Sequence, residues 1–391
     1  MDFPITSILD NDLYKFTMQY AVIEKFPNAI VRYRFVNRGN TPFPPGFDRE
    51  LRQWVEQMKF LSLTPEEKDF LRKRCYYLPE FYLDFLEGYR YNPEEVIIKQ
   101  QGDKLEVFIQ GFWYRTILWE VPLMALISEL FFRMTGQKPN DKKVIENTVI
   151  YKAGFFNDLA IKYADFGTRR RYSYDNHDFV VSLLSSYGKP AFIGTSNVHL
   201  AHKYDLTPIG TQAHEWFMYH GAYFGYTKAN ELALENWADV FKGNLGIALA
   251  DTYTSEVFFR SFNTKLSKLF DGVRQDSGDP IKFARMTIDH YKKLRIDPLS
   301  KVIVFSDSLN PDRVKEIVEA VDGKINISFG IGTNLTNDVG VTPLNIVIKM
   351  DAVKYDKDKW IPTVKLSDDK GKYTGDKQMI EIVKKLLFVD D

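Results

Sequence analysis

The sequence DGVRQDSGDPIKFARMTIDHYKKL, which occupies residues 271–294, combines a short apolar run, a polar turn and an amphipathic helix. Apolar residues recur at positions 281, 284, 288 and 291, which is the spacing of one helix face. Asp279 can cap this helix, and Pro280 suits its first position. The segment therefore predicts a strand that leads through a polar turn into a helix.

The same order of strand, polar or glycine-rich turn and helix recurs from about residue 155 onward. Short apolar runs precede turns at residues 167–169, 195–197, 211–214, 251–252, 276–279, 306–307 and 330–333. About seven repeats of this order are typical of a parallel α/β barrel, whose functional side chains lie at the C-terminal ends of the strands. We expect an irregular TIM-like parallel α/β barrel over residues 121–344, with the site in these turns.

The two ends of the chain have a different pattern. Residues 10–26 have helical spacing, and residues 30–36 alternate as a half-buried strand does. Residues 95–100 and 105–110 flank Gly102 and Asp103 as a hairpin, while residues 344–350 and 362–366 have strand character. We therefore expect a second α+β domain built from residues 1–120 and 345–391.

Composition excludes several classes of protein. The 52 basic residues balance the 52 acidic ones, which argues against a nucleic-acid binder. The longest apolar stretch, residues 121–134, is too short to span a bilayer and is interrupted by Glu129 and Arg133, so we expect a buried helix and no membrane contact. The first residues lack the basic and apolar regions of a signal peptide. The single cysteine, Cys75, excludes an intramolecular disulfide and favours a cytoplasmic location.

The turn DSGDP at residues 276–280, with Arg274 just before it, has two interpretations. Its carboxylates, Asp276 and Asp279, suit Mg²⁺ or ribose hydroxyls, and Arg274 suits an anion. Alternatively the segment is only a turn with a helix cap, which accounts for Asp279 but leaves Arg274 and Asp276 unexplained.

The turn GIGT at residues 330–333 follows the last expected barrel strand. Gly330 and Gly332 allow close approach of the backbone to a phosphate, and Thr333 adds a hydroxyl. Any tight turn can have this composition, but barrels often bind phosphate after strands seven and eight. Position therefore favours a phosphate site.

Two further segments carry candidate groups. His214 follows an expected strand and suits acid/base work or phosphoryl transfer, although a lone histidine is more often structural. Phe166 and Arg169, in DFGTRRR at residues 165–171, offer a ring face and a guanidinium for a small aromatic acid. Consecutive arginines are usually a solvated face. A kinase is excluded because no kinase glycine-rich loop or His-Arg-Asp segment accompanies DFG.

Taken together, these segments resemble the nicotinate phosphoribosyltransferase family over nearly the whole chain. The resemblance rests on DLYK (12–15), LWEVP (118–122), DFGTRR (165–170), GTSN (194–197), GTQAHEW (210–216), RQDSGDP (274–280) and FGIGT (329–333). It implies the irregular barrel, the domain built from both chain ends and a homodimer with shared active sites. It also implies the first step of NAD salvage, classed as a ligase reaction, in which ATP hydrolysis drives transfer through a transient phosphohistidine.

The resemblance assigns roles to individual residues. His214 is the phosphorylated histidine, and Tyr14 reaches the pyridine ring bound by the neighbouring subunit. The remaining assignments from the resemblance are Phe166 stacking on the ring, Thr211 and Arg274 near nicotinate, and Gly330, Gly332 and Thr333 at the 5-phosphate. From the residues themselves we expect Arg169 to help hold nicotinate, and Asp276, Asp279 and Asp307 to bind the ribose or Mg²⁺.

Ser196 bears on substrate choice. Related nicotinamide enzymes have an aspartate there, and a carboxylate would repel the nicotinate carboxylate, so Ser196 favours the acid over the amide. A quinolinate phosphoribosyltransferase is disfavoured by ATP coupling through His214. A catalytically silent pyridine-nucleotide sensor is disfavoured because Asp276, Asp279 and His214 are all present.

Overall fold

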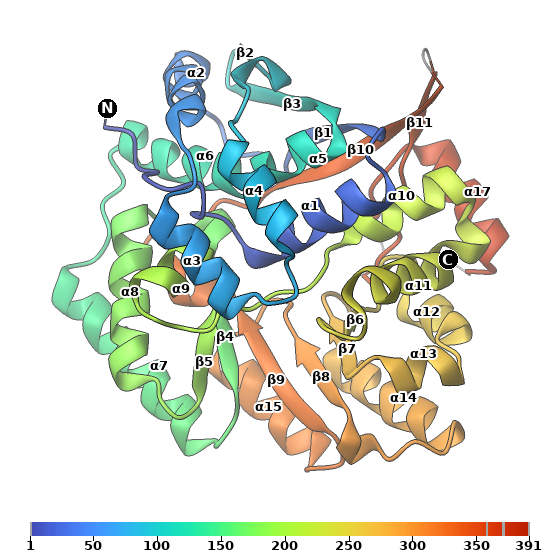
Figure 1. Ribbon diagram of the computed structural model, residues 1–391. Coiled ribbons are helices and arrows are strands. Elements are labelled where there is room, and N and C mark those ends of the chain that lie inside the picture. The colour runs from blue at the N-terminus through green and yellow to red at the C-terminus, as the bar shows by residue number, and fades with distance from the viewer. Residues whose placement is uncertain (1, 357–358, 370–371, 390–391) are drawn as a thin grey trace. The chain divides into compact units, whose positions relative to one another are not determined.

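The protein, seen here as a computed structural model, is described over residues 2–356, 359–369 and 372–389 (Figure 1). The strands are β1 (Ile30–Asn37), β2 (Val96–Gln101), β3 (Lys104–Phe112), β4 (Tyr163–Asp165), β5 (Phe192–Thr195), β6 (Ile247–Leu249), β7 (Gly272–Gln275), β8 (Val302–Phe305), β9 (Asn326–Ile331), β10 (Ile346–Asp356) and β11 (Lys359–Pro362).

The α-helices are α1 (Leu13–Lys25), α2 (Phe47–Gln57), α3 (Pro65–Arg74), α4 (Glu80–Gly88), α5 (Trp113–Thr116), α6 (Glu120–Thr135), α7 (Lys142–Asp158), α8 (Tyr174–Tyr187), α9 (Val198–Lys203), α10 (His214–Phe224), α11 (Ala229–Phe241), α12 (Ser255–Ser261), α13 (Thr264–Leu269), α14 (Pro280–Lys293), α15 (Pro311–Val321), α16 (Thr333–Thr336) and α17 (Lys377–Leu387). Short 3₁₀ helices are η1 (Met58–Phe60), η2 (Pro93–Glu95), η3 (Ile117–Trp119), η4 (Thr168–Arg170), η5 (Tyr226–Lys228) and η6 (Pro298–Ser300).

Two sheets organise the chain. One has six strands in the order β5-β4-β9-β8-β7-β6, and its described pairings, β4 with β5 and β6 through β9, are parallel. The other has five strands in the order β11-β10-β1-β3-β2, with antiparallel hairpins β2–β3 and β10–β11. A parallel sheet with intervening helices, together with a separate antiparallel sheet, confirms the predicted α/β fold class with a second α+β part.

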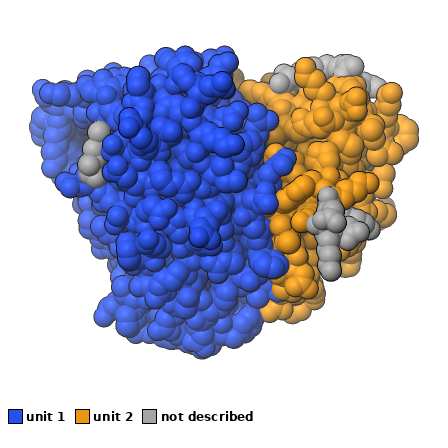
Figure 2. Space-filling view, turned by 90° about the horizontal axis from the view of Figure 1, so that it is seen from above, with its two compact units in different colours: residues 1–23, 32–210, 331–349 blue, residues 24–31, 211–330, 350–391 orange. Residues whose placement is uncertain are grey.

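The chain forms two compact units, coloured in Figure 2. Unit 1 comprises residues 1–23, 32–210 and 331–349, and unit 2 comprises residues 24–31, 211–330 and 350–391. These units group the segments differently from the predicted domains, whose bounds stay a prediction.

Unit 1 is built around α6, whose residues 121–132 are all buried. This confirms the buried helix predicted for the longest apolar stretch. Cys75, the only cysteine of the chain, is also buried here as a free thiol. In the parallel sheet Asp165, the last residue of β4, pairs with Thr195, the last residue of β5. The two strands therefore end at one edge, and Phe166 and Ser196 follow them directly.

Unit 2 repeats this arrangement. Gln275 at the end of β7 pairs with Phe305 at the end of β8, so that the turns after both strands begin at the same edge. Helices α14 and α15 pack together beside these strands (Figure 1). The cap predicted for α14 is confirmed, because Asp279 Oδ1 accepts hydrogen bonds from the backbone N–H groups of Ile281 and Lys282 at 2.8 and 3.2 Å.

Two expected strands are shorter than predicted. Pro208 forms only an isolated parallel bridge with Thr195, in which the Thr195 N–H donates to the Thr207 carbonyl at 3.3 Å and the Ile209 N–H donates to the Thr195 carbonyl at 2.9 Å. Within residues 362–366, β11 ends at Pro362 and Lys365 forms an isolated antiparallel bridge with Thr374. Across the described residues, no helix is both long and apolar enough to cross a membrane.

Candidate functional site

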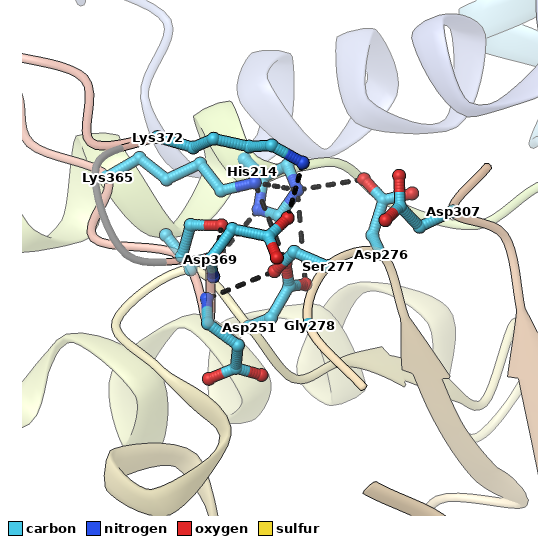
Figure 3. Close-up of polar contacts among 12 residues, drawn as sticks. His214, Asp251, Asp276, Ser277, Gly278, Asp307, Lys365, Asp369 and Lys372 are labelled. Atoms are coloured by element: carbon cyan, nitrogen blue, oxygen red, sulfur yellow. Dashed lines mark hydrogen bonds and ion pairs between the residues drawn. The ribbon is translucent and has the colours of Figure 1, made fainter. Parts of the chain in front are cut away.

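The first cluster lies in unit 2 and centres on His214, the first residue of α10 (Figure 3). The ring Nδ1 is 3.0 Å from the Thr252 hydroxyl, and Nε2 is 3.0 Å from Asp276 Oδ2. The Lys365 ammonium lies 2.8 Å from the same Nε2. Both ring nitrogens therefore have a polar partner, and Nε2 lies between a cation and a carboxylate.

The ring of His214 is neutral near physiological pH. Burial and the nearby Lys365 charge lower its pKa to about 4, against the opposing effect of Asp251 and Asp276. A neutral ring has one N–H and one lone pair, and the ammonium of Lys365 can only donate. The Lys365 contact thus favours a lone pair on Nε2, with the proton on Nδ1 donated to Thr252.

Asp276 remains ionised in this cluster. Burial alone would raise its pKa, but the hydrogen bond with His214 and the charges of Arg274 and Lys365 hold the pKa well below its usual range. Its other oxygen accepts a hydrogen bond from the Ser306 hydroxyl at 2.7 Å. Asp307, next along this turn, has its pKa raised by burial and by the Asp276 charge. The structure thus brings together His214, Asp276 and Asp307 as the sequence predicted.

Three residues of this cluster were not predicted. Asp251 is fully buried, accepts a hydrogen bond from Ser277 through Oδ2 and lies with Oδ1 4.0 Å from His214 Nε2. Thr252 contacts the ring directly, and Lys365 comes from a segment 151 residues further along the chain. Asp251 and Thr252 follow β6 directly, so their strand-end position is a usable signal, whereas nothing local marks Lys365.

Other predicted residues of unit 2 lie around this cluster with partners of their own. Arg274, on β7, is half-buried, and its Nε has no hydrogen-bond partner among the described residues. The Thr211 hydroxyl donates to the Ile247 carbonyl at 3.3 Å. Asp279 is exposed and caps α14, so the cap interpretation holds for this residue whatever further role it has.

The second cluster lies in unit 1 around Ser196, which is buried after β5. Its hydroxyl donates to Asp12 Oδ1 at 2.8 Å. Burial raises the pKa of Asp12, and the Arg169 charge opposes this effect. Arg169 also lies 3.6 Å from Glu120, which pairs with Lys15. A carboxylate, Asp12, is therefore in contact with Ser196, and the role of Ser196 in favouring the acid over the amide stays a prediction.

The aromatic candidates lie in this same unit. Tyr14, on α1, is 8% exposed, and its hydroxyl has no hydrogen-bond partner among the described residues. Burial and the Glu120 charge raise its pKa. Phe166 is half-buried after β4, and its backbone N–H donates to the Ile331 carbonyl at 2.8 Å. Both rings are positioned by backbone elements, as a binding site requires.

Residues 330–333 divide between the end of β9 and the start of α16. Gly330 is buried in the strand, whereas Gly332 and Thr333 are half-buried. A Cβ at Gly332 would lie 3.3 Å from the Phe166 carbonyl oxygen, so the turn packs closely against the segment that follows β4. This packing explains a glycine at 332, and the phosphate role stays a prediction.

The buried polar groups bear on metal binding. Within residues 2–356, 359–369 and 372–389, no three His, Cys, Asp or Glu side chains are arranged to hold a metal by themselves. Asp251 Oδ1 is nevertheless buried and has no hydrogen-bond partner among the described residues. The carboxylates of Asp251 and Asp276 both lie near Nε2 of His214. Mg²⁺ commonly uses one or two carboxylates and completes its shell with substrate phosphates and water. These donors fit such a site.

Comparison with known proteins agrees with this geometry. The chain matches the N-terminal domain model of the nicotinate phosphoribosyltransferase family over residues 9–128 and the family model itself over residues 161–390. The chain belongs to this family. It is 56% identical to nicotinate phosphoribosyltransferase from Chromohalobacter salexigens and 53% identical to that from Desulforapulum autotrophicum, covering 98% and 96% of both chains in each pair.

Solved structures give the same result. The crystal structure of nicotinate phosphoribosyltransferase from Porphyromonas gingivalis matches with a TM-score of 0.96 and 46% identity, covering 98% of this chain and 100% of that one. Membership of the nicotinate phosphoribosyltransferase family confirms the predicted family, fold class and enzyme class.

Proposed function

We propose that the protein forms nicotinate mononucleotide from nicotinate and phosphoribosyl pyrophosphate, the first step of NAD salvage from nicotinate, and couples this transfer to ATP hydrolysis through phosphorylation of His214. The proposed coupling to ATP is supported by the state and place of His214. Its ring is neutral, it is the first residue of an eleven-residue helix, and Lys365 contacts its Nε2. Water and ATP are consumed, and pyrophosphate, ADP and phosphate are released.

The position of His214 suits a phosphorylated side chain. The phosphoryl group of a phosphohistidine carries about two negative charges, and the N-terminal end of a helix favours anions through its free N–H groups and dipole. Lys365 supplies a full positive charge at the same place. Phosphorylation would also change the charge beside Asp276 and Asp307, which gives a direct route from ATP to the residues proposed for the ribose and metal.

Nicotinate binding is assigned to the predicted aromatic and cationic residues. Phe166 stacks on the pyridine ring, Tyr14 contacts the ring bound by the partner subunit of a homodimer, and Arg274 meets the carboxylate. The Nε atom of Arg274 is buried without a hydrogen-bond partner among the described residues, which supports a role in binding an anion. Arg169 and Thr211 also contact nicotinate. Ser196 is the residue proposed to favour nicotinate, the acid, over nicotinamide, the amide.

The phosphoribosyl part is assigned to polar turns. Gly330, Gly332 and Thr333 hold the 5-phosphate, while Asp279 and Asp307 take the ribose hydroxyls. Asp276, with Asp251, holds Mg²⁺, which neutralises the leaving pyrophosphate when bound. The transition state for attack of the ring nitrogen resembles an oxocarbenium ion, so these residues act mainly by positioning and by charge. A cytoplasmic location stays a prediction that rests on the single cysteine.

The test is a purified assay with nicotinate, phosphoribosyl pyrophosphate and Mg²⁺, with and without ATP. We expect nicotinate mononucleotide and pyrophosphate in equal amounts, a rate that rises sharply with ATP, and phosphate on His214 in digested protein. In His214→Ala the ratio of the rates with and without ATP is expected to fall to about one. Better use of nicotinamide, or an ATP effect that survives in His214→Ala, would contradict the proposal.

A further inference from the structure

Lys365 is the residue for which the sequence suggested no role and the geometry suggests a specific one. Its ammonium lies 2.8 Å from Nε2 of His214 (Figure 3). We propose that Lys365 binds the phosphoryl group during its transfer from ATP to His214 and favours the form of the ring in which Nε2 carries the lone pair. This inference rests on the proposed phosphorylation of His214.

The placement of Lys365 is fixed by the backbone on both sides. Its N–H donates to the Thr374 carbonyl and its own carbonyl accepts from the Thr374 N–H, both at 2.8 Å. The next residue, Leu366, donates its N–H to the Thr252 carbonyl at 2.8 Å, which ties the segment to the residue that holds Nδ1 of His214. Backbone hydrogen bonds between the Lys365 segment and the Thr252 segment therefore position the lysine beside the His214 ring.

A purely structural role explains these contacts poorly. Lysine usually keeps its ammonium in water, yet Lys365 is only 7% exposed. Its ammonium forms an ion pair with the buried carboxylate of Asp251 at 3.6 Å, but the shorter contact is with the histidine ring. The ion pair accounts for the burial of the charge, whereas the contact with Nε2 of a neutral ring is not needed for it. A transferred phosphoryl group would fill this place with the complementary charge.

The contact also selects the reactive form of the ring. With Lys365 donating to Nε2, the proton lies on Nδ1 and is donated to Thr252. Asp276 Oδ2, 3.0 Å from Nε2, favours the opposite form, in which Nε2 carries the proton and cannot attack. Lys365 and Asp276 therefore have opposing effects on one nitrogen, and the lysine favours the nucleophile.

The transfer step balances with ATP as the co-reactant. The Nε2 lone pair forms a bond to the γ-phosphorus as the bond from that phosphorus to the β,γ-bridging oxygen breaks, and ADP leaves with the electron pair. Nδ1 keeps its proton, so no proton is transferred. The ring gains one positive charge and the phosphoryl group two negative ones, while ADP carries one negative charge fewer than ATP.

The experiment measures the initial rate at which ³²P from γ-labelled ATP enters His214, scored as acid-labile and base-stable label. The variants are Lys365→Met, Lys365→Gln and Lys365→Arg, with His214→Ala as the blank. Lys377→Met, at an exposed position of the same C-terminal segment, is the matched charge control. The maximal rate is expected to fall about 10²-fold in Lys365→Met, to recover in Lys365→Arg and to stay unchanged in Lys377→Met.

Rescue by the conservative variant separates this role from a structural one. Arginine at position 365 keeps a positive charge beside Nε2 of His214, so Lys365→Arg should restore labelling, whereas Lys365→Gln should not. If Lys365→Met is misfolded by circular dichroism, Lys365→Gln is scored by the same criteria.

The outcomes distinguish this inference from the proposed function. Labelling of Lys365→Met or Lys365→Gln at the wild-type rate overturns the role of Lys365 alone and leaves phosphorylation of His214 standing. Absence of label in the wild type, or label that persists in His214→Ala, overturns the proposed coupling and this inference with it.

Discussion

Arg171→Met is expected to destabilise unit 1 strongly. Arg171 is 1% exposed and forms two hydrogen bonds of 2.7 Å with the fully buried carboxylate of Asp10. In the variant Asp10 retains only the hydrogen bond from Asn197, at 2.7 Å. A buried carboxylate then lacks its counter-ion, while methionine roughly fills the volume of the arginine stem.

The size of the effect follows from this geometry. Breaking a buried ion pair by removing one partner typically costs about 3–5 kcal/mol, and two hydrogen bonds to a charged group are worth a similar amount. We expect a loss of about 3–5 kcal/mol in the free energy of unfolding. Arg313→Met, which breaks an exposed pair with Glu316, should cost at most about 1 kcal/mol.

Urea unfolding followed by circular dichroism and tryptophan fluorescence measures both variants. Burial would raise the pKa of Asp10, but Arg171 helps to hold it below its usual value. In the wild type the stabilisation from this pair is therefore present above the pKa that Asp10 has in the unfolded chain, and it is lost as the pH falls through the pKa of Asp10 in the folded chain. Without Arg171, burial raises the pKa of Asp10, so the stability difference between variant and wild type should shrink as acid protonates Asp10. The double variant Asp10→Asn/Arg171→Met should recover part of the loss. A loss below about 1 kcal/mol, comparable with a surface pair, or a deficit that grows in acid, would refute the reasoning.

Three further outcomes are expected. Asp279→Ala should lower the free energy of unfolding by about 1 kcal/mol in urea because it removes the α14 cap, whereas Asp279→Asn keeps those hydrogen bonds and should lower only kcat/KM for phosphoribosyl pyrophosphate. Ser196→Asp should lower kcat/KM for nicotinate relative to nicotinamide by at least about tenfold, measured with both substrates; an unchanged ratio removes Ser196 as a determinant. An NMR titration of the His214 ring should give a midpoint of about 4, because burial and Lys365 disfavour the imidazolium, so that the ring is neutral above this pH; a midpoint near that of a free histidine would contradict the burial of this ring.

Local signals predicted much of the fold. Asp279 and Pro280 predicted the first residue of α14 correctly, because a cap and a first-turn proline act through the neighbouring backbone alone. The strand-end rule likewise placed Asp276 and Asp307 near each other, since β7 and β8 are parallel and end at a common edge. The strand expected over residues 208–210, before His214, was wrong in extent, because Pro208 forms only an isolated bridge with Thr195.

Contacts between distant segments were beyond the sequence. Lys365 lies in a stretch that shows only strand character, and it reaches His214 because the backbone of this stretch pairs with Thr374 and with Thr252. Arg171 belongs to a run of three arginines that resembles a solvated face, yet its guanidinium is buried on Asp10. Each of these two cations is buried because a residue far away in the sequence contacts it, and no pattern in the local sequence identifies that residue.

The buried thiol of Cys75 makes the protein convenient for spectroscopy. Burial raises the pKa of this thiol to about 11, and thiol reagents react with the thiolate of an accessible cysteine. The native chain is therefore expected to react very slowly with maleimide dyes and thiol-reactive spin labels. A cysteine placed at an exposed position of either unit can be tagged without first removing Cys75, so fluorescence or paramagnetic probes can be attached to an otherwise unaltered chain.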